Sequence, residues 1–182
     1  MVYYKYLFHN MKELSPNEGL VYSTLLSHSL MESENFLLDG TFSNDKAKLF
    51  AEDNGGYIDY QPLSTRQIMS RTDFSFPTVK KIMENLKNKH VIGSDFILCP
   101  TELLDGGYLK VPKGTKLKGQ QLLFYSYITD LCSRYGGATD KWAYRMKEDC
   151  NLTSEDNVYF IIKQLKEKGF LERLNNRRLK IK

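Results

Sequence analysis

The chain has few cysteines and no long hydrophobic run, and both scarcities exclude whole classes of protein. The longest stretch without a charged side chain, residues 19–31, spans 13 residues and contains several hydroxyls. A helix needs about 20 mostly apolar residues to cross a bilayer. The first residues also lack the basic and apolar segments of a signal peptide. We therefore expect a cytoplasmic protein without membrane association.

Cysteine and histidine are too scarce to build a disulfide framework or a metal site. The three cysteines, Cys99, Cys132 and Cys150, are odd in number and widely spaced, as expected of reduced thiols. The three histidines are isolated from one another. The phosphate-binding loop and the short motifs of zinc proteases, serine hydrolases and dithiol oxidoreductases are also missing. We expect a protein that is not an enzyme and needs no metal or cofactor.

Charge is distributed unevenly along the chain. The net charge is only +4, and 41% of the residues are hydrophobic, which suits a globular protein with a substantial core. Residues 1–112 carry 11 Lys and Arg against 14 Asp and Glu, whereas residues 113–182 carry 15 against 8. Such asymmetry favours a second half that faces an anion, most often nucleic acid. A solvated helix surface remains the alternative.

An internal repeat organises the sequence. Residues 14–27 align with residues 117–130 at a constant offset of 103, with apolar residues at helical spacing in both. Residues 78–86 align with residues 157–165 at an offset of 79, again with a helical apolar stripe. The difference of 24 between the offsets places an insertion in the first copy, at roughly residues 32–60. We therefore expect two units, 1–112 and 113–182.

The first unit has the local signals of a helix-turn-helix followed by a hairpin. Ser64 is expected to cap a helix over residues 65–70, and residues 71–74 to make the turn. Ser75 then caps a longer helix that ends near residue 90. Residues 91–98 are typical of a hairpin. Short strands are expected before each first helix, at residues 3–8 and 108–111.

The second unit repeats this order. A helix over residues 141–148 precedes a turn at residues 149–152, and Thr153 is expected to cap the long helix. Residues 170–181 follow as strand, turn and strand. The predicted fold is mainly α with small β-hairpins, in the α+β class, as two tandem winged-helix units.

The sequence also resembles a known family. The segment STRQIMSRTDFSFPTVKKIMENLKNKHVI, residues 64–92, resembles the helix-turn-helix of bacterial winged-helix proteins. Placed after LSPNEGLVYSTLLSHSLM, it is similar to the amino-terminal domain of plasmid and phage replication initiators, which often carry two such units. The resemblance implies sequence-specific binding of double-stranded DNA at a replication origin of a mobile element. A transcriptional regulator of the same fold and a protein-interaction adaptor remain alternatives.

Candidate DNA contacts in the second unit lie on its hairpin and its long helix. Arginine at a hairpin tip can enter the minor groove or hold the backbone, and an exposed amide or ammonium on the helix can contact bases or phosphates. The hairpin candidates are Asn176, Arg177, Arg178 and Lys180, and the helix candidates are Asn157 and Lys163. Tyr159 and Phe160 lie beside the buried stripe and either face DNA or pack on the first unit.

The first unit offers a second set of candidates. Lys80 and Lys81 project away from the apolar stripe of the long helix, and the hydroxyls of Ser75 and Thr78 lie at its start, where phosphates bind. Capping is the alternative role of Ser75. The acidic balance and Asp95 in the hairpin turn favour an alternative role for this unit, in homodimerisation or in binding another protein instead of DNA.

Overall fold

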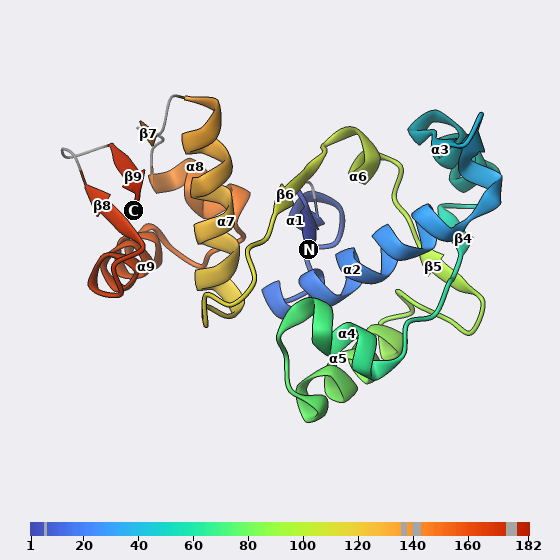
Figure 1. Cartoon of the computed structure of the whole chain (residues 1–182), viewed down its shortest axis with the longest axis horizontal. Helices are drawn as coiled ribbons and strands as arrows, with labels where there is room; N and C mark the ends of the chain where they lie inside the picture. Colours follow the sequence, from blue (N-terminus) through green and yellow to red (C-terminus); the bar gives the residue numbers. More distant parts are fainter. Residues whose placement is uncertain (6, 136–137, 140–142, 174–177) are drawn as a thin grey trace. The chain divides into compact units, whose positions relative to one another are not determined.

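The computed structural model describes residues 1–182 apart from residues 6, 136–137, 140–142 and 174–177. By its internal contacts the chain divides into two units, Met1–Tyr108 and Leu109–Lys182 (Figure 1). The sequence had placed this boundary after residue 112. Each unit is described by itself.

Unit 1 opens with a short strand and a short helix and is built around one long helix. Its elements are β1 (Val2–Tyr4), α1 (Leu7–Asn10), α2 (Pro16–Glu32), η1 (Glu34–Phe36), β2 (Leu37–Leu38), β3 (Thr41–Phe42), α3 (Asn44–Asp53), β4 (Tyr57–Asp59), α4 (Thr65–Thr72), α5 (Phe76–Asn88), β5 (Phe96–Leu98) and α6 (Glu102–Asp105). Helices α2, α4 and α5 pack against one another (Figure 1).

Unit 2 contains the same kinds of element in a shorter chain. Strand β6 (Tyr108–Lys110) lies at the boundary and is followed by α7 (Gly119–Arg134), β7 (Ala138–Thr139), α8 (Ala143–Asp149), α9 (Glu155–Glu167), β8 (Leu171–Arg173) and β9 (Leu179–Ile181). Helix α9 packs against both α7 and α8. Strands β8 and β9 pair antiparallel with Leu171 opposite Ile181, and the sheet order is β7-β9-β8.

The two units share one order of elements and one strand arrangement. In unit 1, β4 pairs antiparallel with β5, and Ile92 forms a bridge to Ile97 of β5, so β5 lies between β4 and the bridge. In unit 2, β9 lies between β7 and β8 in the same way. The described part of the chain therefore combines helices with small sheets, which confirms the predicted α+β class.

Positions that align in the repeat occupy equivalent places in the two cores. Most of the aligned apolar side chains of α2 and α7 are buried, and so are those of the α5 and α9 stripes. The buried pairs are Leu20/Leu123, Val21/Phe124, Ser23/Ser126, Leu25/Ile128, Val79/Val158, Ile82/Ile161 and Leu86/Leu165. The offsets of 103 and 79 thus relate residues that pack at equivalent positions in the cores of the two units.

The ends of α5 and α9 close with the same backbone turn. The N–H of His90 donates to the Lys87 carbonyl, and the next N–H, of Val91, reaches back to Leu86. At the offset of 79, Gly169 donates to Lys166, and the following residue donates to Leu165. His90 and Gly169 both have a positive φ, of 55° and 79°. This left-handed turn after a helix satisfies its last carbonyls.

A polar cluster repeats at the same two offsets. In unit 1, Lys89 Nζ lies 2.9 Å from Glu18 Oε2, and Asn85 Nδ2 donates to Glu18 Oε1 over 2.9 Å. In unit 2, Lys168 Nζ donates to Gln121 Oε1 over 2.6 Å, and Gln121 also donates to Gln164. In each unit, the first long helix is thereby joined to the end of the helix that follows the turn.

The insertion between α2 and β4 is more ordered than its turn signals indicated. Asn44 and Asp45 begin helix α3, because the Ser43 hydroxyl accepts from the Lys46 N–H as an N-cap and an acidic residue favours a first helical turn. Strand β4, inside the expected insertion, pairs with β5 and so belongs to the repeated sheet. The strand predicted over residues 3–8 was wrong beyond Tyr4, because the chain turns there into α1.

Three further boundaries differ from the prediction. Ser154, not Thr153, caps α9, because its hydroxyl accepts from the N–H of Asn157, three residues on. Helix α4 runs to Thr72, two residues beyond the predicted end, and closes on Asp73, which adopts a left-handed φ of 57°. Of the helix predicted over residues 141–148, residues 141–142 lie outside the described chain, and α8 ends at Asp149.

Candidate nucleic-acid interface

Helix α5 presents two lysines on the side opposite its buried stripe. Val79, Ile82 and Leu86 face the core of unit 1, and their spacing fixes which way the other residues point. Lys80 and Lys81, which lie between the stripe positions, are exposed. This places two ammonium groups on one turn of the outer face.

The start of α5 carries two hydroxyls that bond to each other. Ser75 is the N-cap residue, but its side chain makes no bond to the helix backbone. Instead, Ser75 Oγ lies 2.8 Å from Thr78 Oγ1. Ser75 is exposed and Thr78 half-buried, so this hydroxyl pair is accessible at a helix N-terminus, where the backbone dipole favours an anion.

The charge of the two helix-turn-helix segments does not follow the charge of the two halves. Residues 64–90 carry six Lys and Arg against two Asp and Glu, although residues 1–112 are acidic overall. The aligned residues 143–169 carry five against five, although residues 113–182 are basic overall. The basic character of the second half therefore comes largely from residues before α7 and after α9.

The two helix candidates of unit 2 already have partners. Asn157 is half-buried, and its Nδ2 lies 3.3 Å from Gln120 Oε1 and 3.4 Å from Thr153 Oγ1. Lys163 is exposed, with its Nζ 3.9 Å from Glu167 Oε1. The amide of Asn157 faces α7 rather than a ligand, so α9 offers fewer polar groups to DNA than the sequence indicated.

The outer face of α9 carries two aromatic side chains at the positions where α5 carries two lysines. At the offset of 79, Tyr159 aligns with Lys80 and Phe160 aligns with Lys81. The two aromatic side chains are 51% and 57% exposed. Glu155 in the first turn is also exposed. Acidic side chains before the two rings and Lys163 and Lys166 after them nearly cancel, so this face lacks the positive charge that would attract phosphate.

The hairpin of unit 2 carries exposed basic residues on both strands. Arg178, immediately before β9, is exposed, as are Lys180 on β9 and Arg173 at the end of β8. Lys180 lies opposite Glu172 in the strand register, which offsets part of its charge. The candidates Asn176 and Arg177 lie outside the described residues.

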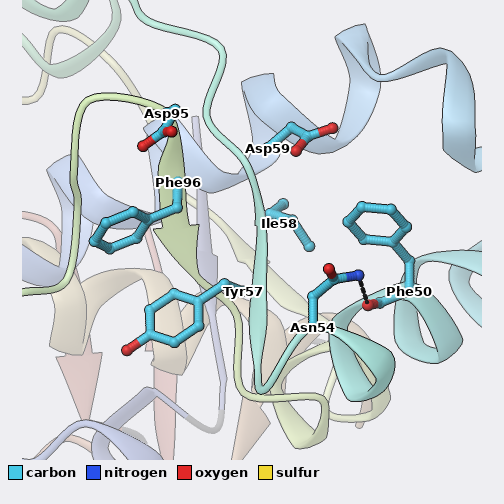
Figure 2. A pocket seen from close by; sticks show the side chains of 7 residues that line it. All are labelled: Phe50, Asn54, Tyr57, Ile58, Asp59, Asp95 and Phe96. Atoms are coloured by element: carbon cyan, nitrogen blue, oxygen red, sulfur yellow. Dashed lines mark hydrogen bonds between the residues drawn. The ribbon is translucent and has the colours of Figure 1, made fainter.

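The hairpin of unit 1 borders a cavity with acidic and aromatic walls. Figure 2 shows the Tyr57 and Phe96 rings beside each other, with centroids 5.0 Å apart, and the carboxylates of Asp59 and Asp95 at the same cavity. The cavity measures about 500 Å³ and is also lined by Phe50 of α3 and by Asn54 at the end of that helix, whose side chain donates to the Phe50 carbonyl. Two carboxylates make this hairpin a poor phosphate contact.

The described residues keep their thiols buried and include neither a metal-type cluster nor a membrane-length helix. The three cysteines are buried in the core, and burial raises the pKa of Cys99 to about 12, which keeps it protonated. Among the residues that the structure places, no three His, Cys, Asp or Glu side chains gather as a metal site requires. No helix in the described ranges has the length and apolar character to cross a bilayer.

Two exposed arginines are not among the DNA contacts predicted from the sequence. Arg66 lies on α4, which packs against α5, and Arg173 lies beside the tip of the second hairpin. A count of charge over residues 64–90 alone would have pointed to Arg66, because it adds to the lysines of α5. Arg173 precedes the predicted tip by only two residues.

No family model, curated protein sequence or solved structure matches this chain.

Proposed function

We propose that this chain binds double-stranded DNA through two tandem winged-helix units. The order of helix, strand, two helices and hairpin, with the last strand in the middle of each small sheet, supports this assignment for both units. The repeat of the polar cluster and of the turn after α5 and α9 supports a common origin of the two folds.

The observation that carries the proposal is the basic outer face of α5. In a helix-turn-helix, the second helix enters the major groove and the preceding helix lies near the backbone. In this arrangement Lys80 and Lys81 contact bases or phosphates of the DNA. Ser75, at the start of the helix, lies beside the DNA backbone. Arg66 on α4 adds a phosphate contact.

The hairpin of unit 2 supplies the second group of contacts. Arg173, Arg178 and Lys180 are exposed around its tip, in the half of the chain with the larger positive charge. Hairpin arginines of this kind hold the backbone or enter a narrow minor groove. Unit 2 therefore binds DNA with its hairpin, and unit 1 binds it with its helix.

The resemblance to plasmid and phage replication initiators favours origin recognition on a mobile element as the biological role. Regulation of transcription by the same fold is the second candidate. Selection of bound duplexes from a random library distinguishes the two roles, because an origin supplies directly repeated sites and a promoter operator supplies a palindrome.

The test of DNA binding itself is a fluorescence anisotropy titration of a labelled random duplex of about 30 base pairs with the full chain. Binding that weakens steeply as salt rises is expected, because each phosphate neutralised releases counterions and contributes about −0.9 to the log–log slope. No binding at low salt would contradict the proposal and leave the adaptor role.

A further inference from the structure

The outer face of α9 has an acidic and a basic side chain on either side of two aromatic ones. An antiparallel copy of the same helix would therefore present the opposite charge at each end. Asp156 lies one turn before Phe160, and Lys163 lies about one turn after it, all on the side opposite the buried stripe. Tyr159 flanks Phe160, and Lys166 lies beyond, also exposed. Between Asp156 and Lys163 the face therefore runs from acidic through aromatic to basic, and Glu167 follows one turn later beside Lys163.

Two adjacent aromatic side chains that are each more than half exposed are an uncommon feature of a helix surface without a partner. The aligned positions of α5 are lysines, so the winged-helix fold does not itself require apolar residues there. Tyrosine and phenylalanine are among the residues that concentrate at the centres of protein interfaces.

We propose that α9 pairs antiparallel with α9 of a second copy of this chain, with Phe160 and Tyr159 at the centre. A two-fold axis near Phe160 brings Asp156 of each copy opposite Lys163 of the other. The antiparallel direction also places the N-terminus of one helix dipole beside the C-terminus of the other. The antiparallel pairing therefore sets opposite charges and apolar side chains of the two copies against each other. A parallel pairing would set like charges against each other.

In this dimer Lys163 pairs with Asp156 of the second copy in place of Glu167 of its own chain. In the single chain its ammonium lies 3.9 Å from Glu167, an exposed pair whose contribution to stability is small. Pairing of one 13-residue helix from each copy buries less than a standard interface of about 1,600 Å², so a dimer that dissociates in the micromolar range is expected. Two copies on neighbouring DNA sites would bind more tightly through the shared contact.

This inference does not depend on DNA binding, because it concerns the face of α9 that the proposed DNA contacts leave unused. It also names a different surface from the unit 1 interface expected from the acidic half of the chain. Its experiment is therefore carried out without DNA, on the full chain.

The experiment is sedimentation velocity from about 1 to 200 μM, a range that brackets a micromolar dissociation constant. The parent chain is expected to shift from monomer to dimer, and Phe160→Ser to raise the dissociation constant by more than about tenfold. Leu49→Ser, which removes an equally exposed apolar side chain from α3, is the matched control and leaves the dimer unchanged. Circular dichroism checks that each variant is folded.

A charge exchange makes the test specific to the antiparallel pairing. Asp156→Lys and Lys163→Glu each weaken the dimer, and the double variant restores it, because the opposed charges are then exchanged but still matched. A monomer at all concentrations would overturn the proposal. A dimer that survives Phe160→Ser, or a double variant as weak as the single ones, would place the interface elsewhere and overturn it equally.

Discussion

Lys89 and Glu18 join the end of α5 to the start of α2 through an ion pair of 2.9 Å, and Glu18 is almost fully buried. Burial alone would raise the pKa of Glu18, but the hydrogen bonds from Lys89, from the N–H and hydroxyl of Ser15 and from Asn85 outweigh it and lower the pKa to about 2. In unit 2 the same place is held by Gln121 and Lys168. The repeat has therefore kept the contact and changed its charge.

Glu18→Gln, which introduces the residue of unit 2, is expected to destabilise the chain by about 2 kcal/mol near pH 7. A fall in pKa from 4.5 to about 2 corresponds to roughly 3 kcal/mol, and the partial exposure of Lys89 reduces it. Because the folded pKa is lowered, this stability is complete above pH 4.5 and is lost as the pH falls towards about 2. Urea unfolding across this range measures the difference between the variant and the parent.

The matched control is Glu13→Gln, which changes the same charge at an exposed position close to α2. It is expected to change stability by less than about 0.5 kcal/mol at any pH. If the difference between Glu18→Gln and the parent stays constant from neutral to acid pH, the ion pair does not contribute as described.

His90→Gly is expected to stabilise unit 1, and Gly169→His to destabilise unit 2. Both positions have a left-handed φ after a long helix, where a side chain is strained and glycine is not. Glycine also makes the unfolded chain more flexible, so the net change is about 0.5–1 kcal/mol in each direction. Thermal unfolding of both variants tests the pair, and a lower melting temperature for His90→Gly would contradict it.

Tyr22→Phe is expected to cost about 1–1.5 kcal/mol, because a buried hydrogen bond is lost without loss of the ring. The Tyr22 side chain has no exposed surface, and its hydroxyl donates to the Leu98 carbonyl over 2.6 Å, which ties α2 to β5. Tyr125→Phe at the aligned position is the control. The Tyr125 ring packs edge-on against Phe170, a contact that phenylalanine preserves, so its cost is expected below about 0.5 kcal/mol. Equal costs in chemical denaturation would contradict this account.

Much of the fold follows from local signals in the sequence. Ser64 caps α4 through its hydroxyl, as predicted, and the capping box of Ser15 and Glu18 begins α2. Ser75 occupies the predicted N-cap position of α5, but its side chain makes no capping bond. The apolar stripe that includes Val79 predicts which side of α5 is buried. These features depend on neighbours within a turn or two, which is why periodicity and capping residues predict them.

The features that the sequence did not predict depend on contacts between distant segments. Strand β4 is three residues long and is defined by pairing with β5, almost 40 residues later. Asparagine is a residue type that commonly contacts bases, but the side chain of Asn157 hydrogen-bonds to Gln120 of α7 and so points inward. The outward direction of Lys80 and Lys81 was predicted, but charge summed over halves of the chain made this unit look acidic, whereas a ligand meets the surface of single elements.

The central claim, that α5 of unit 1 meets DNA, is tested most directly by Lys80→Ala combined with Lys81→Ala. The measurement is anisotropy of a labelled duplex over a salt series, with Lys46→Ala combined with Lys48→Ala as a control that removes two lysines from α3 of the same unit. Loss of two phosphate contacts is expected to weaken binding by about tenfold or more and to reduce the salt slope by nearly two, while the control stays close to the parent. Parent-like affinity and slope in the α5 variant, or an equal loss in the α3 control, would contradict the account.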